Sequence, residues 1–152
     1  MEVETSFSRI LVPIDGSDHA DRALDFALDI AEKYGAEVEI LTVLSNSPTA
    51  PLAWIGDSDV WVASYSNDLR LSSEKMLSDA LDKARKNKPH LHLSKKLLEG
   101  RPSDEIVRTA QEGNFDLIVM GSRGLGGITE FFLGSVSNRV ADEADCPVII
   151  VK

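Results

Sequence analysis

Glycines and hydroxyl side chains in the last third of the chain could together bind a phosphate group. Gly121, Gly124 and Gly134 follow an apolar run at residues 116–120, and Ser135 comes directly after the last of them. Glycines, which lack Cβ, allow the backbone to turn sharply and to present N–H groups to an anion. A helix that begins here would add free amides and the positive end of its dipole. The pattern predicts a phosphate-binding loop and, with it, a nucleotide ligand.

A second group of polar residues follows a short apolar run at residues 9–14. The run ends in Asp15, Gly16 and Ser17, a pattern typical of a buried strand followed by a turn and a serine that caps a helix. Apolar residues then recur at helical spacing until Gly35, which suits the position just after a helix. The pattern places Asp15 at the end of a buried strand.

The rest of the chain alternates strand and helix patterns. Residues 37–44 predict a second strand, and residues 45–59, with two prolines and a glycine, predict a long loop. Residues 90–98 form the most polar strand candidate, which suits a sheet edge. Ser103 is expected to cap a helix that ends near Glu112. The remaining predicted elements are a helix marked by Leu69, Met76, Leu77, Ala80 and Ala84 that stops near Asn87, strands at 116–120 and 147–151, and a helix through Val136, Val140 and Ala144.

This alternation predicts an α/β fold with an open sheet of five parallel strands, right-handed crossovers and helices on both faces. The apolar runs 9–14 and 116–120 suit central strands and the polar run 90–98 suits an edge, which favours the strand order 3-2-1-4-5. In that order the connections diverge between strands one and four, where open α/β sheets bind ligands beyond the carboxyl ends of their strands. We therefore expect Asp15 and Gly121 to meet at one crevice.

The composition predicts a single domain over residues 1–152, since 43% hydrophobic and 27% charged residues suit a globular chain of this length. The formal net charge of -9 argues against a nucleic-acid partner, which requires a basic surface. The single cysteine, Cys146, cannot form an intrachain disulfide, no signal-peptide pattern opens the chain, and the apolar runs are too short to cross a membrane. We expect a cytoplasmic protein with no membrane segment.

The motif Gly-x2-Gly-x9-Gly-Ser at residues 121–135, with Pro-Ile-Asp-Gly-Ser at residues 13–17, resembles the ATP-binding branch of the universal stress protein family. The resemblance covers nearly the full chain. It includes Leu-Thr-Val at residues 41–43, the Gly-x-Pro turn at 100–102 and the apolar ending at 145–151. A glycine pattern alone would be weak evidence, but here it stands between a strand and a helix, with matching chain ends.

The resemblance implies ATP as the ligand, accompanied by Mg²⁺ or Mn²⁺. Asp15 would lie near the ribose hydroxyls or the metal, and Val43 would pack against the adenine. This chain departs from the common family pattern at Thr42, where a histidine often stands, and in an additional Gly126-Gly127 pair. The implied binding residues are Pro13, Ile14, Asp15 and Val43 on the adenosine side, Met120, Gly121, Arg123 and Gly124 around the ribose and phosphates, and Gly134, Ser135, Val136 and Ser137 at the phosphates.

The last predicted strand indicates a homodimer. The segment Val148–Val151 is strongly apolar, yet the expected strand order puts it at an edge, where a bare strand invites pairing with another chain. The resemblance also implies a dimer through the last strand. We expect an antiparallel homodimer across this strand, together with an unidentified protein partner.

Three functions fit these features. The favoured one is an ATP-binding dimer that acts as a sensor or regulatory module in the stress response, with the nucleotide shifting the conformation of the loop at 45–59. A slow ATP hydrolase or nucleotidyl transferase would use the same site, with Asp15, Arg123 and Ser135 as candidate groups, although the chain has no Gly-Lys-Ser/Thr phosphate loop. A scaffold without nucleotide would recruit a partner through the surface around Trp54 and Trp61.

Overall fold

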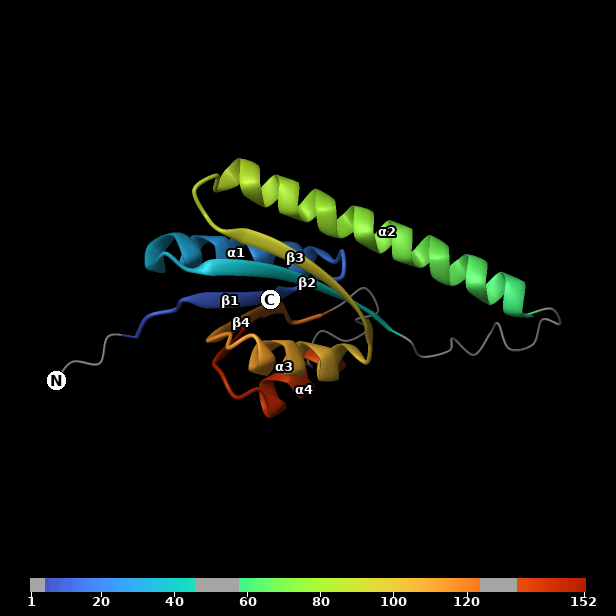
Figure 1. The fold of residues 1–152 in the computed structure, drawn as a ribbon. Coiled ribbons are helices and arrows are strands. Elements are labelled where there is room, and N and C mark those ends of the chain that lie inside the picture. The colour runs from blue at the N-terminus through green and yellow to red at the C-terminus, as the bar shows by residue number, and fades with distance from the viewer. Residues whose placement is uncertain (1–4, 46–57, 124–133) are drawn as a thin grey trace.

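The computed structural model describes residues 5–45, 58–123 and 134–152, and its strands form one sheet in the order β3-β2-β1-β4-β5 (Figure 1). Every neighbouring pair of strands is parallel, so the expected α/β fold and strand order are confirmed. The strands are β1 (Arg9–Pro13), β2 (Glu37–Ser45), β3 (Leu93–Gly100), β4 (Leu117–Gly121) and β5 (Val148–Val151), and the helices are α1 (Asp18–Tyr34), α2 (Ser58–Asn87), α3 (Pro102–Glu112) and α4 (Ser135–Glu143).

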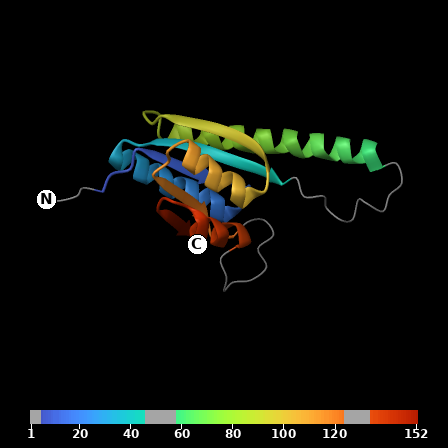
Figure 2. The ribbon, with the colours of Figure 1, turned by 60° about the horizontal axis from the view of Figure 1, so that its bottom comes forward.

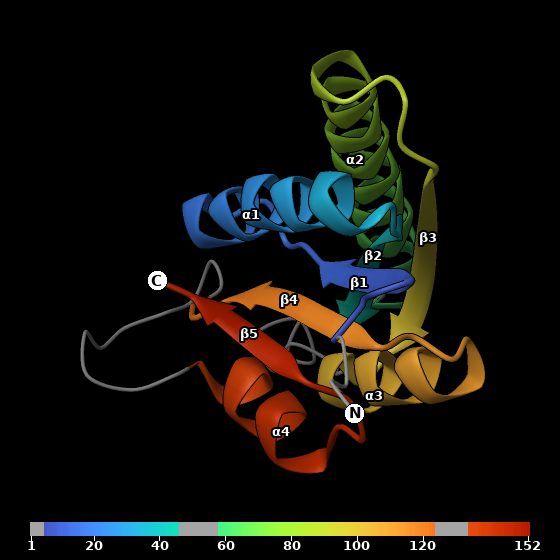
Figure 3. The same cartoon turned by 90° about the vertical axis from the view of Figure 1, so that its left-hand side faces the viewer.

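Two pairs of helices cover the two faces of the sheet. Figure 3 shows α1 and α2 on one side and α3 and α4 on the other, with β3 and β5 at opposite edges. Successive side chains of a strand point to opposite faces, so Ile10 and Val12 pack with α1 while Leu11 packs towards α3 and α4. All three are fully buried, which explains why β1 is apolar at consecutive positions and does not alternate.

Helix α1 begins and ends where the sequence predicts. The Ser17 hydroxyl oxygen accepts a hydrogen bond from the Ala20 N–H (3.2 Å), so Ser17 caps the helix. Gly35 ends it with a φ of 70°, and its N–H donates to the Ala31 carbonyl. Ser17 and Gly35 thus set where α1 begins and ends.

Helix α2 is longer than the sequence predicts. It begins at Ser58, so the last two residues of the predicted loop are helical, and the rest of that loop lies outside the described residues. Figures 1 and 2 both show its N-terminal part extending beyond the sheet. Leu69 lies in the helix that it was predicted to mark, but its side chain is 40% exposed, whereas Leu77, Leu81 and Ala84 are buried. Only the C-terminal half of α2 has a sheet face to cover.

The third strand lies further along the chain than predicted. It runs from Leu93 to Gly100 and not over residues 90–98, because pairing with β2 begins where the Val38 N–H donates to the His92 carbonyl (3.0 Å). The residues before His92 form a turn that connects α2 to the sheet. β3 nevertheless forms an edge of the sheet, as its polar sequence indicates.

The predicted cap of α3 is wrong. The capping position is Arg101, and Pro102 takes the first helical turn, so Ser103 lies inside the helix and is buried. Proline favours this position because its fixed φ suits a helix start and it needs no N–H partner there. The end of the helix at Glu112 agrees with the prediction.

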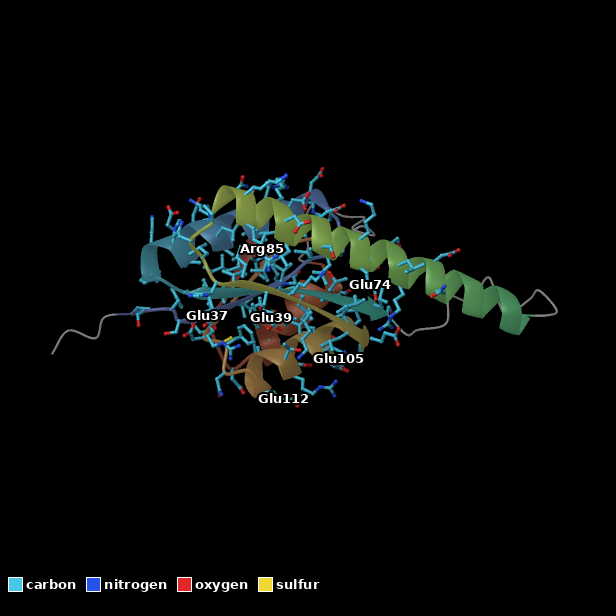
Figure 4. All side chains as sticks on the ribbon, turned by 45° about the horizontal axis from the view of Figure 1, so that its top comes forward. Glu37, Glu39, Glu74, Arg85, Glu105 and Glu112 are labelled. Carbon is cyan, nitrogen blue, oxygen red and sulfur yellow. The ribbon has the colours of Figure 1, made fainter. Side chains whose placement is uncertain are left out.

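Acidic residues occur on several of the described elements. Figure 4 shows Glu37 and Glu39 on β2, Glu74 on α2, and Glu105 and Glu112 on α3. The net charge of -9 is therefore shared among several elements. Within the described ranges, no helix combines the length and apolar character that crossing a membrane requires.

Candidate functional site

A cavity of about 440 Å³ lies beyond the carboxyl ends of β1 and β4. The connections from these strands diverge there, because α1 packs on one face of the sheet and α4 on the other. Parallel sheets bind ligands at this kind of topological switch point, and the volume suits a small molecule. The lining residues are Pro13, Ile14, Asp15, Ala20, Leu41, Val43, Pro102, Ile106, Met120, Gly121, Arg123, Gly134, Ser135, Val136 and Ser137.

The structure brings together almost all residues that the sequence nominates. Each predicted binding residue lines this cavity except Gly124, which lies outside the described residues. Sequence reasoning missed Ala20, Leu41, Pro102 and Ile106. The sequence contains a signal for Pro102 and Ile106. The turn after β3 must lie at the same end of the sheet as the other strand ends, and the two residues are four positions apart, which places them on one face of α3. α3 therefore supplies a wall of the cavity that was not predicted from the sequence.

Ile14 forms part of the cavity lining, and its backbone N–H and carbonyl are both hydrogen-bonded to residues of β2. Its N–H donates to the Leu41 carbonyl (2.8 Å), and its carbonyl accepts from the buried Thr42 hydroxyl (3.1 Å). Thr42 is the position where the sequence departs from the common family pattern. Here the Thr42 hydroxyl donates a hydrogen bond to the Ile14 carbonyl. The threonine therefore holds the backbone in place where the chain leaves β1 beside the cavity.

Asp15 occupies the turn between β1 and α1. One carboxylate oxygen accepts a hydrogen bond from the Ser17 N–H (3.0 Å), which orients the side chain of this exposed residue. Gly16 between them has a φ of 86°, a conformation that favours glycine. A Cβ at Gly16 would also lie 2.9 Å from the Met76 sulfur on α2. The turn thus carries a carboxylate at the cavity with little freedom to move.

Gly121 allows the end of β4 to lie against the first turn of α1. A Cβ at this position would lie 2.8 Å from both the carbonyl carbon and the Cβ of His19, and 2.9 Å from the Ala20 nitrogen. Only glycine fits this approach without a backbone shift. Both elements contribute residues to the cavity lining, so this contact sets how closely β4 and α1 approach each other beside the cavity.

The N-terminus of α4 borders the cavity on its polar side. Gly134 precedes the helix with φ -55° and ψ 151°, and its carbonyl accepts the Asn138 N–H (2.9 Å). The amides of Ser135, Val136 and Ser137 belong to the first turn, where helices have N–H groups without intrahelical partners. Together with the helix dipole, these donors favour an anion.

The cavity has two chemically different sides. Val43, Leu41 and Ile106 give β2 and α3 an apolar wall, whereas Arg123 and the first turn of α4 contribute a positive charge, hydroxyls and amides. Such a site can hold an apolar ring on one side and an anionic group on the other. The arrangement therefore suits a molecule with both features.

Cys146 lies away from this site, just before β5, and packs against the core between the sheet and α3–α4. Burial raises the pKa of its thiol, which disfavours the reactive thiolate. This agrees with the packing role expected for a small apolar residue. Across the described ranges, no three His, Cys, Asp or Glu side chains form a group that could hold a metal ion.

Comparison with known proteins identifies close relatives of the whole chain. Residues 6–152 match the model of the universal stress protein family. The universal stress protein YxiE of Bacillus subtilis (strain 168) is 34% identical over 151 residues, an alignment that covers 96% of this chain and 99% of that protein. Sequence similarity therefore extends over all the elements that build the cavity.

Solved structures share the fold over nearly the full length. The universal stress protein UspA from Lactobacillus plantarum superposes with a TM-score of 0.85 at 25% identity, covering 98% of this chain and 100% of that one. A universal stress protein in complex with cAMP has a TM-score of 0.70 at 28% identity, with coverage of 97% and 98%. The protein from Archaeoglobus fulgidus in complex with dAMP has a TM-score of 0.67 at 27% identity, with coverage of 97% and 100%.

Proposed function

The chain belongs to the universal stress protein family, and we propose on that premise that it binds an adenine nucleotide, ATP, in the cavity between β1 and β4. The observation that carries the proposal is the pairing of an apolar wall with a helix N-terminus across one cavity of nucleotide size. Two structural neighbours contain cAMP and dAMP, which are adenine nucleotides. Adenine would lie against Val43, and the phosphates would lie at Gly134 to Ser137.

A divalent cation, Mg²⁺ or Mn²⁺, would accompany the triphosphate. Such cations prefer oxygen ligands, and they usually bind through one or two carboxylates together with the phosphates. Asp15 and the Ser135 hydroxyl both line the cavity and could supply those oxygens. The cation would offset phosphate charge in a protein whose own net charge is -9.

We further propose that nucleotide occupancy regulates a dimer in the stress response. A ligand shifts a protein towards the conformation with which it makes more contacts. Here the ligand would contact β1, β2, β4, α3 and α4 at once, so occupancy would favour one relative placement of these elements. A cytoplasmic protein partner would then recognise that placement.

The ligand proposal is tested by the composition of the purified protein. We expect protein purified without added nucleotide, then denatured, to release an adenine nucleotide that mass spectrometry measures near one per chain. If the protein is empty, calorimetric titration with ATP and Mg²⁺ is expected to show saturable binding. If neither released nucleotide nor saturable ATP binding is found, the proposal is contradicted. If the protein instead converts ATP into ADP and phosphate, and Asp15→Ala abolishes this activity, the result would support a hydrolase.

The dimer proposal rests on the open edge of β5. The Ile118 N–H donates to the Pro147 carbonyl (3.0 Å) and the Ser122 N–H to the Val151 carbonyl (2.8 Å). Alternate residues of a parallel strand bond the same neighbour, so Val148 and Ile150 direct their backbone groups outwards. These groups are available to pair with the same strand of a second chain.

Ile150→Pro is expected to convert a micromolar dimer into a monomer. Proline removes an outward N–H without removing a bond to β4, and its ring blocks close approach of a second strand. Sedimentation velocity measures the change. Ile150→Ala, which shortens the side chain but keeps the N–H, is the control and should remain dimeric. A monomeric wild-type protein, or a dimeric Ile150→Pro variant, would contradict pairing through this edge.

A further inference from the structure

Ser122 connects four elements around the polar side of the cavity. Its N–H donates to the Val151 carbonyl on β5 (2.8 Å), and its hydroxyl oxygen lies 2.9 Å from Nδ1 of His19 on α1. Its carbonyl accepts the Gly134 N–H (2.6 Å) and lies 3.2 Å from the Ser137 hydroxyl at the start of α4. Every polar group of this buried residue is therefore engaged.

The carbonyl of Ser122 sets where α4 begins. It bonds to both ends of the first turn, at Gly134 and at Ser137, and so fixes the amides between them relative to the end of β4. Ser122 is not itself among the residues that line the cavity. It acts on a ligand only through the backbone that it holds.

The hydroxyl of Ser122 is anchored from α1. His19 supplies the side-chain contact, and the neighbouring Ser17 hydroxyl lies 3.4 Å from the Arg123 carbonyl, a weaker second link. The first turn of α1 lies so close to β4 at this point that a Cβ on Gly121 would come within 2.8 Å of the His19 carbonyl carbon. His19 thus links α1 to Ser122, and the Ser122 carbonyl links this residue to the start of α4.

We propose that Ser122 and His19 are positioning residues for the phosphate end of the nucleotide site. The inference rests on the proposed function, since it concerns how the same cavity holds its ligand. Among the described residues, no hydrogen bond connects this pair to the apolar wall of β2 and α3, so we expect adenosine binding to be independent of the pair. Only the part of the binding free energy that comes from the phosphates depends on the link.

The test compares ATP with adenosine on the same variants. Ser122→Ala removes the hydroxyl but keeps the N–H and carbonyl, and His19→Ala removes the ring. His19→Asn is the matched control, because its amide places a polar atom close to the Nδ1 position. Calorimetric titration gives the dissociation constants of ATP with Mg²⁺ and of adenosine for each protein, and thermal unfolding reports whether each remains folded.

We expect ATP affinity to fall about three- to tenfold in Ser122→Ala and in His19→Ala, the effect of one lost hydrogen bond. Adenosine affinity should change less than twofold, and His19→Asn should stay near the wild type. The double variant should be no weaker than either single one, because the two residues share one link. Unchanged ATP affinity in both alanine variants, or equal loss for ATP and adenosine, would overturn the inference. A wild-type protein that binds neither compound would instead overturn the proposed function, and this inference with it.

Discussion

Gly121→Ala is expected to lose nucleotide binding and to be less stable than the wild type. The new Cβ would lie 2.8 Å from two atoms of His19 and 2.9 Å from the Ala20 nitrogen. Two of these three are backbone atoms of a helix, which cannot move aside as a flexible side chain can, so β4 and α1 must separate. We expect the free energy of unfolding to fall by about 1–3 kcal/mol. ATP affinity should fall roughly 100-fold, equivalent to about 2.7 kcal/mol, because β4 and α1 both contribute residues to the cavity lining and would move apart.

Gly35→Ala is the matched control for this prediction. Gly35 has a φ of 70°, and a Cβ there would meet nothing within 4 Å, so alanine is strained only by its backbone conformation. That strain costs about 1–2 kcal/mol, similar to the loss expected for Gly121→Ala. Because Gly35 stands at the opposite end of α1 from the cavity, its ATP affinity should be unchanged. Urea denaturation and calorimetry measure both quantities, and equal ATP affinity in the two variants would contradict the role given to Gly121.

The strand order could be predicted because burial differs sharply between strands. Leu11 on β1 and Ile118 on β4 are fully buried, and such strands show unbroken apolar runs in the sequence. Lys95 and Lys96 on β3 are exposed, which a central strand would not tolerate. This difference between apolar and polar strands is visible in the sequence. The central strands and one edge strand could therefore be assigned without coordinates.

The parts that could not be predicted depend on contacts outside the local pattern. The first turns of α2 lie beyond the sheet, so no apolar stripe marks where the helix begins at Ser58. Ser103 has the right residue type for a cap, but Pro102 competes for the helix start and takes it. In both cases the local sequence predicts one helix start, but the surrounding structure places the start at a different residue.

The polar residues of the site could be predicted from the sequence more fully than the apolar residues that form its walls. The glycine motif and Asp15 follow strand ends that a parallel sheet must bring together, and the structure places them around one cavity. Ile106 belongs to no motif, and Pro102 belongs only to the Gly-x-Pro turn. Both line the cavity because α3 packs against this face of the sheet. Polar binding residues can be recognised in a sequence by their residue types. The apolar residues of a cavity wall have the same types as the rest of the core and cannot be told apart from it.

Ser135→Pro is expected to weaken ATP binding while leaving α4 intact. Ser135 is the first residue of the helix, a position at which proline is favoured because its missing N–H has no intrahelical partner. Gly134 has a ψ of 151°, which is also the conformation that a following proline requires. The substitution therefore removes one amide donor from the cavity with little cost to the fold.

Ser135→Ala separates the amide from the hydroxyl, since it removes only the side-chain oxygen. A hydrogen bond to a charged group contributes about 1.5–3 kcal/mol, so ATP should bind roughly 10- to 100-fold more weakly to Ser135→Pro than to Ser135→Ala. Adenosine, which has no phosphate to contact this amide, should bind both variants alike. Equal ATP affinity of the two variants, measured by calorimetry, would show that the Ser135 N–H does not bind a phosphate. The phosphate would then have to be bound by the amides of Val136 and Ser137 or by Arg123.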